Sequence, residues 1–156
     1  MRQFAALIIL LLFTGWMSPV FATSDQAYKD YLFQYDLYRQ KNASFSVART
    51  EYFKFQTLQS QNTALVAAKD VLTARDALLR AYLLLLNEKL IENQGLGIVE
   101  KQLYQTLIQN EVTFLDKHAL LTPSIGSLGD AQSVSEQLTS HYTILYAAMR
   151  QTTGAL

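Results

Sequence analysis

The longest apolar stretch of the chain, residues 63–91, constrains the fold more than any other feature. Leucines recur in it at seven-residue steps, a spacing that keeps them on one side of an α-helix. They are Leu65, Leu72, Leu79 and Leu86. This is also the pattern of a coiled coil, but alanines and further leucines beside the column widen the apolar arc. We therefore expect the central helix of a bundle, because so wide an arc needs more than one neighbour.

The rest of the chain predicts three more helices. Only two prolines and six glycines occur, and no segment alternates apolar and polar residues as a strand would. We expect an all-α fold that resembles a four-helix bundle: a long antiparallel hairpin with two further helices packed on it. The expected helices, within one domain of residues 23–156, span about 26–56, 62–92, 98–121 and 131–152.

The connection between the first two expected helices is open to two interpretations. Residues 57–62 are polar but contain no glycine or proline, so they fit either a tight turn or one continuous helix. The two helices have similar lengths. Matching lengths favour the hairpin, because an antiparallel pair then buries both faces along its whole length.

Charge and composition exclude several functions. The net charge is zero, which argues against nucleic acid as a partner. Cysteine is absent, so no thiolate metal site or cysteine nucleophile can form. No phosphate-binding loop, dinucleotide fingerprint or nucleophile elbow is present, and no His or Glu spacing is typical of a di-metal bundle. We expect no enzymatic activity, cofactor or metal.

The N-terminus has the pattern of an export signal. Arg2 is followed by an apolar run over residues 4–13, and small residues precede a cleavage position after Ala22. We predict that residues 1–22 are a cleaved signal peptide. The protein would then be periplasmic, displayed at the cell surface or extracellular. The alternative is an uncleaved membrane anchor formed by residues 3–24, which are just long enough to span a bilayer.

Charged side chains inside the apolar arcs are the best candidates for a site. Arg49 falls among the aromatic residues of the first helix, Arg75 near the centre of the second helix's arc, and Glu111 on the apolar face of the third. Tyr52 and Tyr82 lie in the same arcs. Three interpretations stay open: arginines that extend to solvent or stack on aromatic rings, a buried ion pair of Glu111 with one arginine, or a site for an anionic ligand.

Helical spacing also predicts where three further titratable side chains lie. His118 lies two turns after Glu111 on the third helix, and His141 borders the apolar face of the fourth. Asp76 falls on the polar side of the second helix. The helical spacing alone brings none of them to a common site.

Three short segments carry a resemblance to other proteins. They are ARTEY at residues 48–52, ARD at 74–76 and FLDKH at 114–118. The chain after residue 22 resembles uncharacterised exported α-helical proteins of candidate-phylum bacteria. The resemblance implies an exported helical protein and implies no activity or site.

Two apolar helical faces without a reactive motif predict a structural or interaction protein of the cell envelope. Its partners would be a second copy of the chain or another envelope protein, with a membrane involved only if the N-terminal segment is retained. The alternative is a binding module that holds an anionic or glycan ligand on a face lined by aromatic residues and arginines.

Overall fold

The computed structural model of the chain describes residues 23–156. The signal peptide predicted at residues 1–22, and nearly all of the alternative anchor at residues 3–24, lie outside this range. The described elements are α2 (Ser24–Phe55), α3 (Leu58–Glu92), α4 (Ile98–Ala119), the short 3₁₀ helix η1 (Thr122–Ser124) and α5 (Leu128–Ala155).

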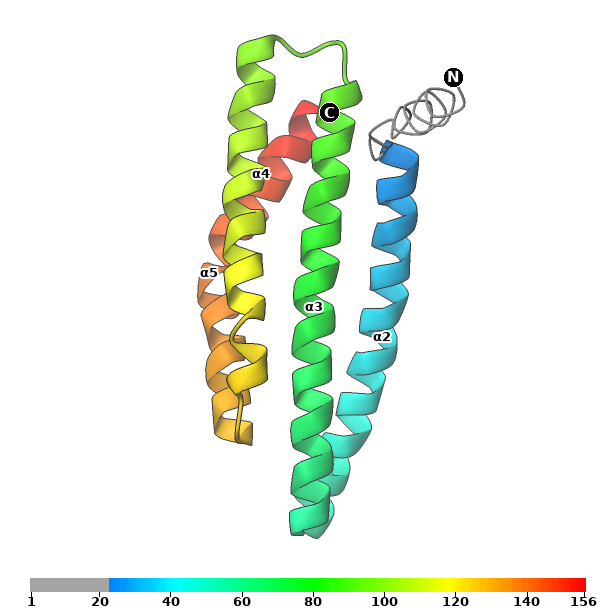
Figure 1. Cartoon of the computed structure of the whole chain (residues 1–156), viewed down its shortest axis with the longest axis vertical. Helices are drawn as coiled ribbons and strands as arrows, with labels where there is room; N and C mark the ends of the chain where they lie inside the picture. The colour runs from blue at the N-terminus through cyan, green and yellow to red at the C-terminus, as the bar shows by residue number, and fades with distance from the viewer. Residues whose placement is uncertain (1–22) are drawn as a thin grey trace, which may run out of the picture.

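The helices run up and down, with α3 in the centre (Figure 1). In that view α2 lies on one side of α3 and α4 on the other, with α5 beside α4. Helix α2 packs along α3, and α3 also contacts α4 and α5, which contact each other. The predicted all-α fold, a long helical hairpin with two further helices packed on it, is confirmed.

A tight turn joins α2 to α3, so the two helices form a hairpin and not one continuous helix. Gln56 has the left-handed backbone conformation, with φ of 49°, and its N–H bonds to the carbonyl of Tyr52. Thr57 and Ser60 then form a capping box in which each side chain accepts from the other's backbone N–H. Helix α3 therefore starts at residue 58 instead of the expected 62.

The main apolar core lies where α3, α4 and α5 meet. Its buried members are Leu83, Leu86, Leu90, Ile108, Val112, Leu115, Leu138 and Leu145. A smaller cluster involves the N-terminal half of α3, where Ala68 and Leu72 pack against Ile125, Ala131 and Val134. One side of α3 is thus buried along most of its length by the two helices that follow it.

Helix α2 buries few side chains completely in its contact with α3. Only Ser24, Ala27 and Ala48 of its 32 residues are buried. Several larger side chains of α2 are half-buried: Tyr31, Tyr38, Phe45 and Tyr52. Tyr31 packs on Tyr82 of α3, with ring centroids 5.5 Å apart, and Lys41 donates to Asp70 of α3 at 2.7 Å. None of the described helices is long and apolar enough to cross a membrane.

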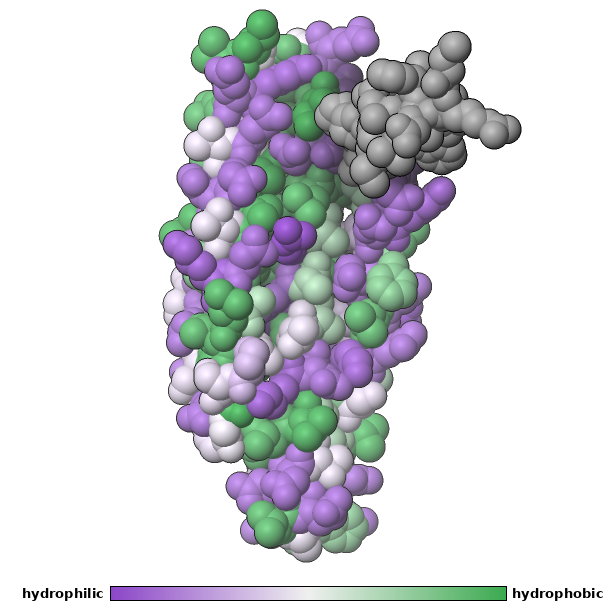
Figure 2. All heavy atoms as spheres, in the orientation of Figure 1, coloured by the Kyte–Doolittle hydropathy of each residue, from purple (hydrophilic) through white to green (hydrophobic). Residues whose placement is uncertain are grey.

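The segment between α4 and α5 is tied to α3 by a lysine. Nζ of Lys69 donates to the carbonyl oxygens of Pro123 and Ile125, at 3.3 and 3.0 Å. Further along, Nε of Arg80 donates to Asp116 at 2.8 Å. Figure 2 shows polar and apolar residues mixed over this face, with apolar ones gathered in the upper part between α4 and α3. These contacts fix α4 and the start of α5 against α3.

The core can be tested by truncating one leucine. Leu83 is fully buried in the main cluster, whereas Leu120 is 75% exposed. We expect Leu83→Ala to lower the free energy of unfolding by about 2–5 kcal/mol, because it removes buried methyl groups and leaves a cavity. Leu120→Ala should change it by less than about 0.5 kcal/mol. Equal losses in urea denaturation would contradict this core.

Candidate functional site

A groove lies between α2, α3 and α5, and we call it the arginine groove. Its volume is about 650 Å³, within the range of about 300–1,000 Å³ typical of small-molecule sites. The lining residues are Tyr38, Asn42, Phe45, Arg49, Tyr52 and Phe53 of α2, Ala64, Ala68, Val71, Leu72 and Arg75 of α3, and Leu128, Gly129, Ala131, Gln132 and Ser135 of α5.

The side-chain sizes along α2 and α3 create this groove. Ala64 and Ala68 of α3 leave a shallow floor beside the contact with α2. Phe45 and Tyr52 of α2 are half-buried at its edge and form one wall. The first two turns of α5 form the other wall. The resulting surface is apolar along its floor and polar at a few defined points.

The charged lining is entirely positive. Arg49 and Arg75 face the groove, and no aspartate or glutamate within residues 23–156 lines it. The guanidinium of Arg49 lies over the ring of Phe53, 5.2 Å from its centroid, and its side chain is exposed. The chain as a whole has no net charge, so this surface concentrates positive charge locally.

The Arg75 guanidinium has few partners for a half-buried charge. Its Nη1 donates to Oγ of Ser135 at 3.0 Å. Nε lies 3.9 Å from Oδ1 of Asp76, and neither Nε nor Nη2 has a hydrogen-bond acceptor among the described residues. Burial lowers the pKa of Arg75 and the nearby carboxyl of Asp76 opposes that effect. An arginine nevertheless stays charged, so this site holds an incompletely satisfied cation.

Behind Arg75, a buried histidine links three helices. Nδ1 of His118, on α4, lies 2.7 Å from Oδ2 of Asp76 on α3. Nε2 of the same ring lies 2.9 Å from the carbonyl oxygen of Val134 on α5. Both side chains of the pair are almost fully buried. His118 is thus bonded through both ring nitrogens.

These two contacts determine how many protons the pair holds. A carbonyl oxygen only accepts, so Nε2 of His118 must carry a hydrogen. The short contact between Nδ1 and Oδ2 of Asp76 then needs a second proton, on one atom or the other. Burial raises the pKa of Asp76, while the hydrogen bond from His118 lowers it by less. With this shared proton the pair has no net charge.

A second carboxyl–histidine pair lies further up α4. Oε2 of the buried Glu111 is 2.7 Å from Nε2 of His141 on α5. The His141 ring stacks on Phe114, with centroids 3.6 Å apart, and Phe114 also stacks on His118 at 5.8 Å. Phe114 therefore lies between the two imidazoles, and the two pairs hold α4 against both of its neighbours.

The structure brings together three of the five residues proposed from sequence. Arg49, Arg75 and Tyr52 all line the arginine groove. Tyr82 lies elsewhere: its ring is 5.5 Å from that of Tyr31, and its hydroxyl is 3.5 Å from Oγ1 of Thr153. Glu111 is bonded to His141 and not to either arginine, so the ion pair considered from sequence is not formed.

The environment predicted for Asp76 is wrong, and the contact of Ser135 with Arg75 was not predicted. Asp76 was expected on the polar side of its helix, but it is 3% exposed. It is buried because α3 has neighbours on two sides, so part of its polar side also faces the core. The signal that could have revealed it was His118, a polar residue in an apolar face that requires a partner.

The histidine and carboxyl side chains of the described residues form pairs and no larger group. Residues 23–156 contain no group of three or more His, Asp or Glu side chains that could hold a metal ion. The two carboxyl–histidine pairs satisfy each other inside the bundle. What the arginine groove can do chemically is hold an anion through charge and hydrogen bonding.

The protonation of Asp76 predicts a pH dependence of stability. Because burial raises its pKa, the folded state holds this proton more tightly than the unfolded chain, where the pKa is about 3.9. The resulting stability is complete below about pH 4 and is lost as pH rises through the folded pKa. The amide introduced by Asp76→Asn donates to His118 without titrating. We expect wild type to lose stability relative to this variant with rising pH, by at most about 1.4 kcal/mol per pH unit.

The measurement is urea denaturation of both proteins at pH values from 4 to 8. Asp36→Asn is the matched control, because the Asp36 side chain is 69% exposed. The difference between this control and wild type should stay constant with pH. If the Asp76→Asn and wild-type curves also stay parallel, Asp76 does not bind the additional proton.

Comparison with known proteins adds no family to this description. The chain matches no protein-family model, no curated protein and no solved structure at a significant level.

Proposed function

We propose that the protein is a helical binding module that holds an anionic ligand in the arginine groove. The observation that supports this most directly is the charged lining, which consists of Arg49 and Arg75 without a carboxylate. Arginine presents its donors in a planar fork that suits carboxylate, phosphate and sulfate groups. The aromatic residues beside the arginines supply a surface on which the rest of a ligand can lie.

Arg75 makes the strongest contribution to this proposal. The guanidinium is half-buried, its one hydrogen bond within the described chain is to a neutral hydroxyl, and the adjacent Asp76 shares a proton with His118. A buried charge without full compensation is costly, so an anion beside it would lower the free energy of the site. Arg49 lies 11 residues after Tyr38, the residue of α2 that faces Arg75, so it is about 16 Å further along the groove and would contact only a ligand long enough to span that distance.

The proposed setting is outside the cytoplasm. The apolar N-terminal segment predicts export, and the fold contains no cysteine that a change of redox compartment would affect. The proposed action is binding alone, since the groove contains no nucleophile beside a general base. The module would therefore carry, sense or store its ligand.

The test is a thermal-unfolding screen of the purified chain against laurate, dodecyl phosphate, a sulfated disaccharide and inorganic phosphate. At least one should raise the melting temperature, because a ligand present at 100 times its dissociation constant stabilises by about 2.7 kcal/mol. The rise should disappear in the double variant Arg49→Gln/Arg75→Gln.

Arg39→Gln is the matched control for this screen. Arg39 is an exposed arginine of α2 that lies over Tyr35 and does not line the groove. Its removal changes the net charge in the same direction as removal of Arg49, so a lost response would indicate unspecific attraction. Absence of any shift across the four anions would reject the proposed function.

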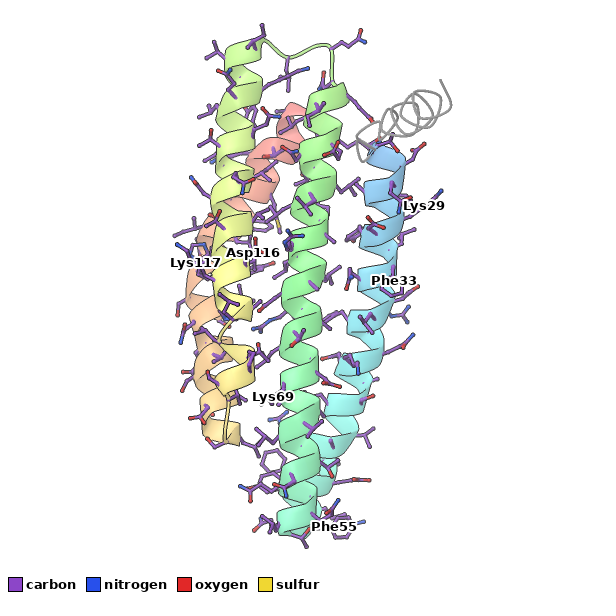
Figure 3. The ribbon with its side chains drawn as sticks, viewed as in Figure 1. Lys29, Phe33, Phe55, Lys69, Asp116 and Lys117 are labelled. Atoms are coloured by element: carbon purple, nitrogen blue, oxygen red, sulfur yellow. The ribbon has the colours of Figure 1, made fainter. Side chains whose placement is uncertain are left out.

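A second candidate is a non-enzymatic interaction protein of the envelope that associates with itself. It is favoured by exposed apolar side chains at both ends of the bundle: Phe55 and Leu58 beside the α2–α3 turn, and Ile98 and Val99 at the start of α4. Figure 3 shows Phe55 at the tip of the hairpin. Exposed apolar groups that cluster in this way are typical of contact surfaces.

Light scattering after size exclusion tests the second candidate. We expect a dimer or larger species that dissociates when Phe55→Ser and Leu58→Ser are combined, because the substitutions remove apolar area from the contact. Val66→Ser, an exposed apolar position of α3 away from the turn, is the control. A monomer at every concentration would reject self-association.

A further inference from the structure

We propose that two copies of the chain associate through α2, with the two α2 helices side by side and antiparallel. This inference rests on the second candidate function, self-association, and specifies the surface and the geometry of the contact. Three observations support it: an exposed stripe along α2, the separation of charge along the same helix, and the match of the stripe with itself in the reverse direction.

Helix α2 carries two neighbouring stripes of residues along its length. One of them contacts α3 and contains the buried Ala27 and Ala48 and the half-buried Tyr31 and Tyr38. The other repeats at alternating steps of four and three residues, which is the spacing of a coiled-coil seam. We call it the outer stripe. All of its members are exposed: Tyr28, Leu32, Tyr35, Arg39, Asn42, Ser46, Arg49 and Phe53.

The outer stripe lacks a neighbouring helix along most of its length. Among the elements of residues 23–156, only α3 packs along α2. Large apolar side chains nevertheless lie at both ends of the stripe, where Tyr28 is 50% exposed and Phe53 is 59% exposed. A helix with two adjacent seams is suited to two neighbours, because each seam removes apolar area from water only against another helix. The described chain supplies one neighbour, and a second copy supplies the other.

The distribution of charge along α2 favours a second copy in the antiparallel direction. Residues 24–38 contain three aspartates and one lysine, a net charge of −2, whereas residues 39–55 contain two arginines, two lysines and one glutamate, a net charge of +3. Lys41 is paired with Asp70 of α3, and the second half remains positive without it. An antiparallel pair places each negative half along the positive half of the other copy, where opposite charges attract. A parallel pair would place like charges together.

The outer stripe also matches itself when one copy is reversed. Its midpoint lies between Arg39 and Asn42, so a second copy centred there places Tyr28 of one chain beside Phe53 of the other. In the middle, Asn42 lies beside Arg39 of the second copy, and an amide oxygen can accept from a guanidinium group. Apolar ends therefore meet apolar ends, and the polar middle meets itself.

This arrangement involves both the hairpin tip and the arginine groove. Phe55 lies two residues after Phe53, so the tip of one copy comes beside the start of α2 in the other. Asn42, Arg49 and Phe53 also line the arginine groove, so a second copy in this position covers the α2 wall of the groove. Self-association through α2 and ligand binding in the groove therefore compete.

The geometry can be tested by cross-linking, because the chain has no cysteine of its own. We expect the double variant Tyr28→Cys/Phe53→Cys to form covalent dimers with a short bismaleimide cross-linker. The two positions are about 38 Å apart along α2, so they cannot react within one chain. Neither single variant should cross-link by itself, but a mixture of the two should. Dimers of each single variant alone would show a parallel pair and overturn the inference.

The matched control for cross-linking is Phe33→Cys/Val47→Cys. Both side chains are exposed on α2 and lie outside the outer stripe. This variant should remain uncross-linked under the same conditions. Equal cross-linking of the two double variants would indicate random collision and would also overturn the inference.

The apolar ends of the outer stripe can be tested separately. Leu32→Ser/Phe53→Ser should raise the dimer dissociation constant in analytical ultracentrifugation at least about tenfold, because it removes apolar area from both ends of the contact. Phe33→Ser/Val47→Ser is the control and should associate as wild type does. Circular dichroism shows whether each variant keeps its helical content. A dimer that Leu32→Ser/Phe53→Ser leaves unchanged would contradict the pairing of α2.

The outcomes separate this inference from both candidate functions. If the dimer dissociates in the Phe55→Ser/Leu58→Ser variant while Tyr28→Cys/Phe53→Cys does not cross-link, the pairing of α2 is rejected and self-association stands. If the chain is a monomer at every concentration, both are rejected. Anion binding in the arginine groove is judged independently, by the thermal shift of the monomer.

Discussion

Helix α3 has to bury two sides at once, and most of the structure follows from that requirement. Asp70 and Tyr82 contact side chains of α2, whereas Leu83, Leu86 and Leu90 pack against α4 and α5. Successive residues of an α-helix point about 100° apart. Two neighbours in sequence can therefore reach different environments: Arg75 lines the groove beside α2, and Asp76 is buried against α4.

The carboxyl–histidine pairs fix how the helices are placed against each other, whereas the apolar contacts contribute buried area. Leucine packing tolerates small displacements of one helix along another, but a hydrogen bond of 2.7 Å does not. His118 bonds to α3 and α5 at once, and Glu111 adds a second bond from α4 to α5. Buried polar pairs of this kind contribute little net stability. We infer that their main effect is to fix the position of α4 along its neighbours.

Helical spacing predicted which residues share one face of a helix. It did not predict which neighbouring helix each part of that face contacts. The spacing indicated the hairpin and the arcs that bring Arg49, Tyr52 and Arg75 to one groove. It could not place Tyr82, two turns beyond Arg75, because the neighbour at each level of α3 depends on the lengths and tilts of the other helices. The partner of Glu111 depends on the same register between α4 and α5, which the loops set.

The positive charge of Arg75 connects the arginine groove to the polar core, because Asp76 lies beside it. Asp76 is the carboxyl nearest to Arg75 along α3 and would ordinarily neutralise it, but its other oxygen shares a proton with His118. The pair has no net charge while it holds that proton, so most of the positive charge of Arg75 remains uncompensated. Ser135 offers a dipole and not a charge. Without that proton the groove would be an apolar slot beside a satisfied ion pair. With it, the slot has a cation at one point of its floor, which under the proposed function would favour an acidic ligand over a neutral one of the same shape.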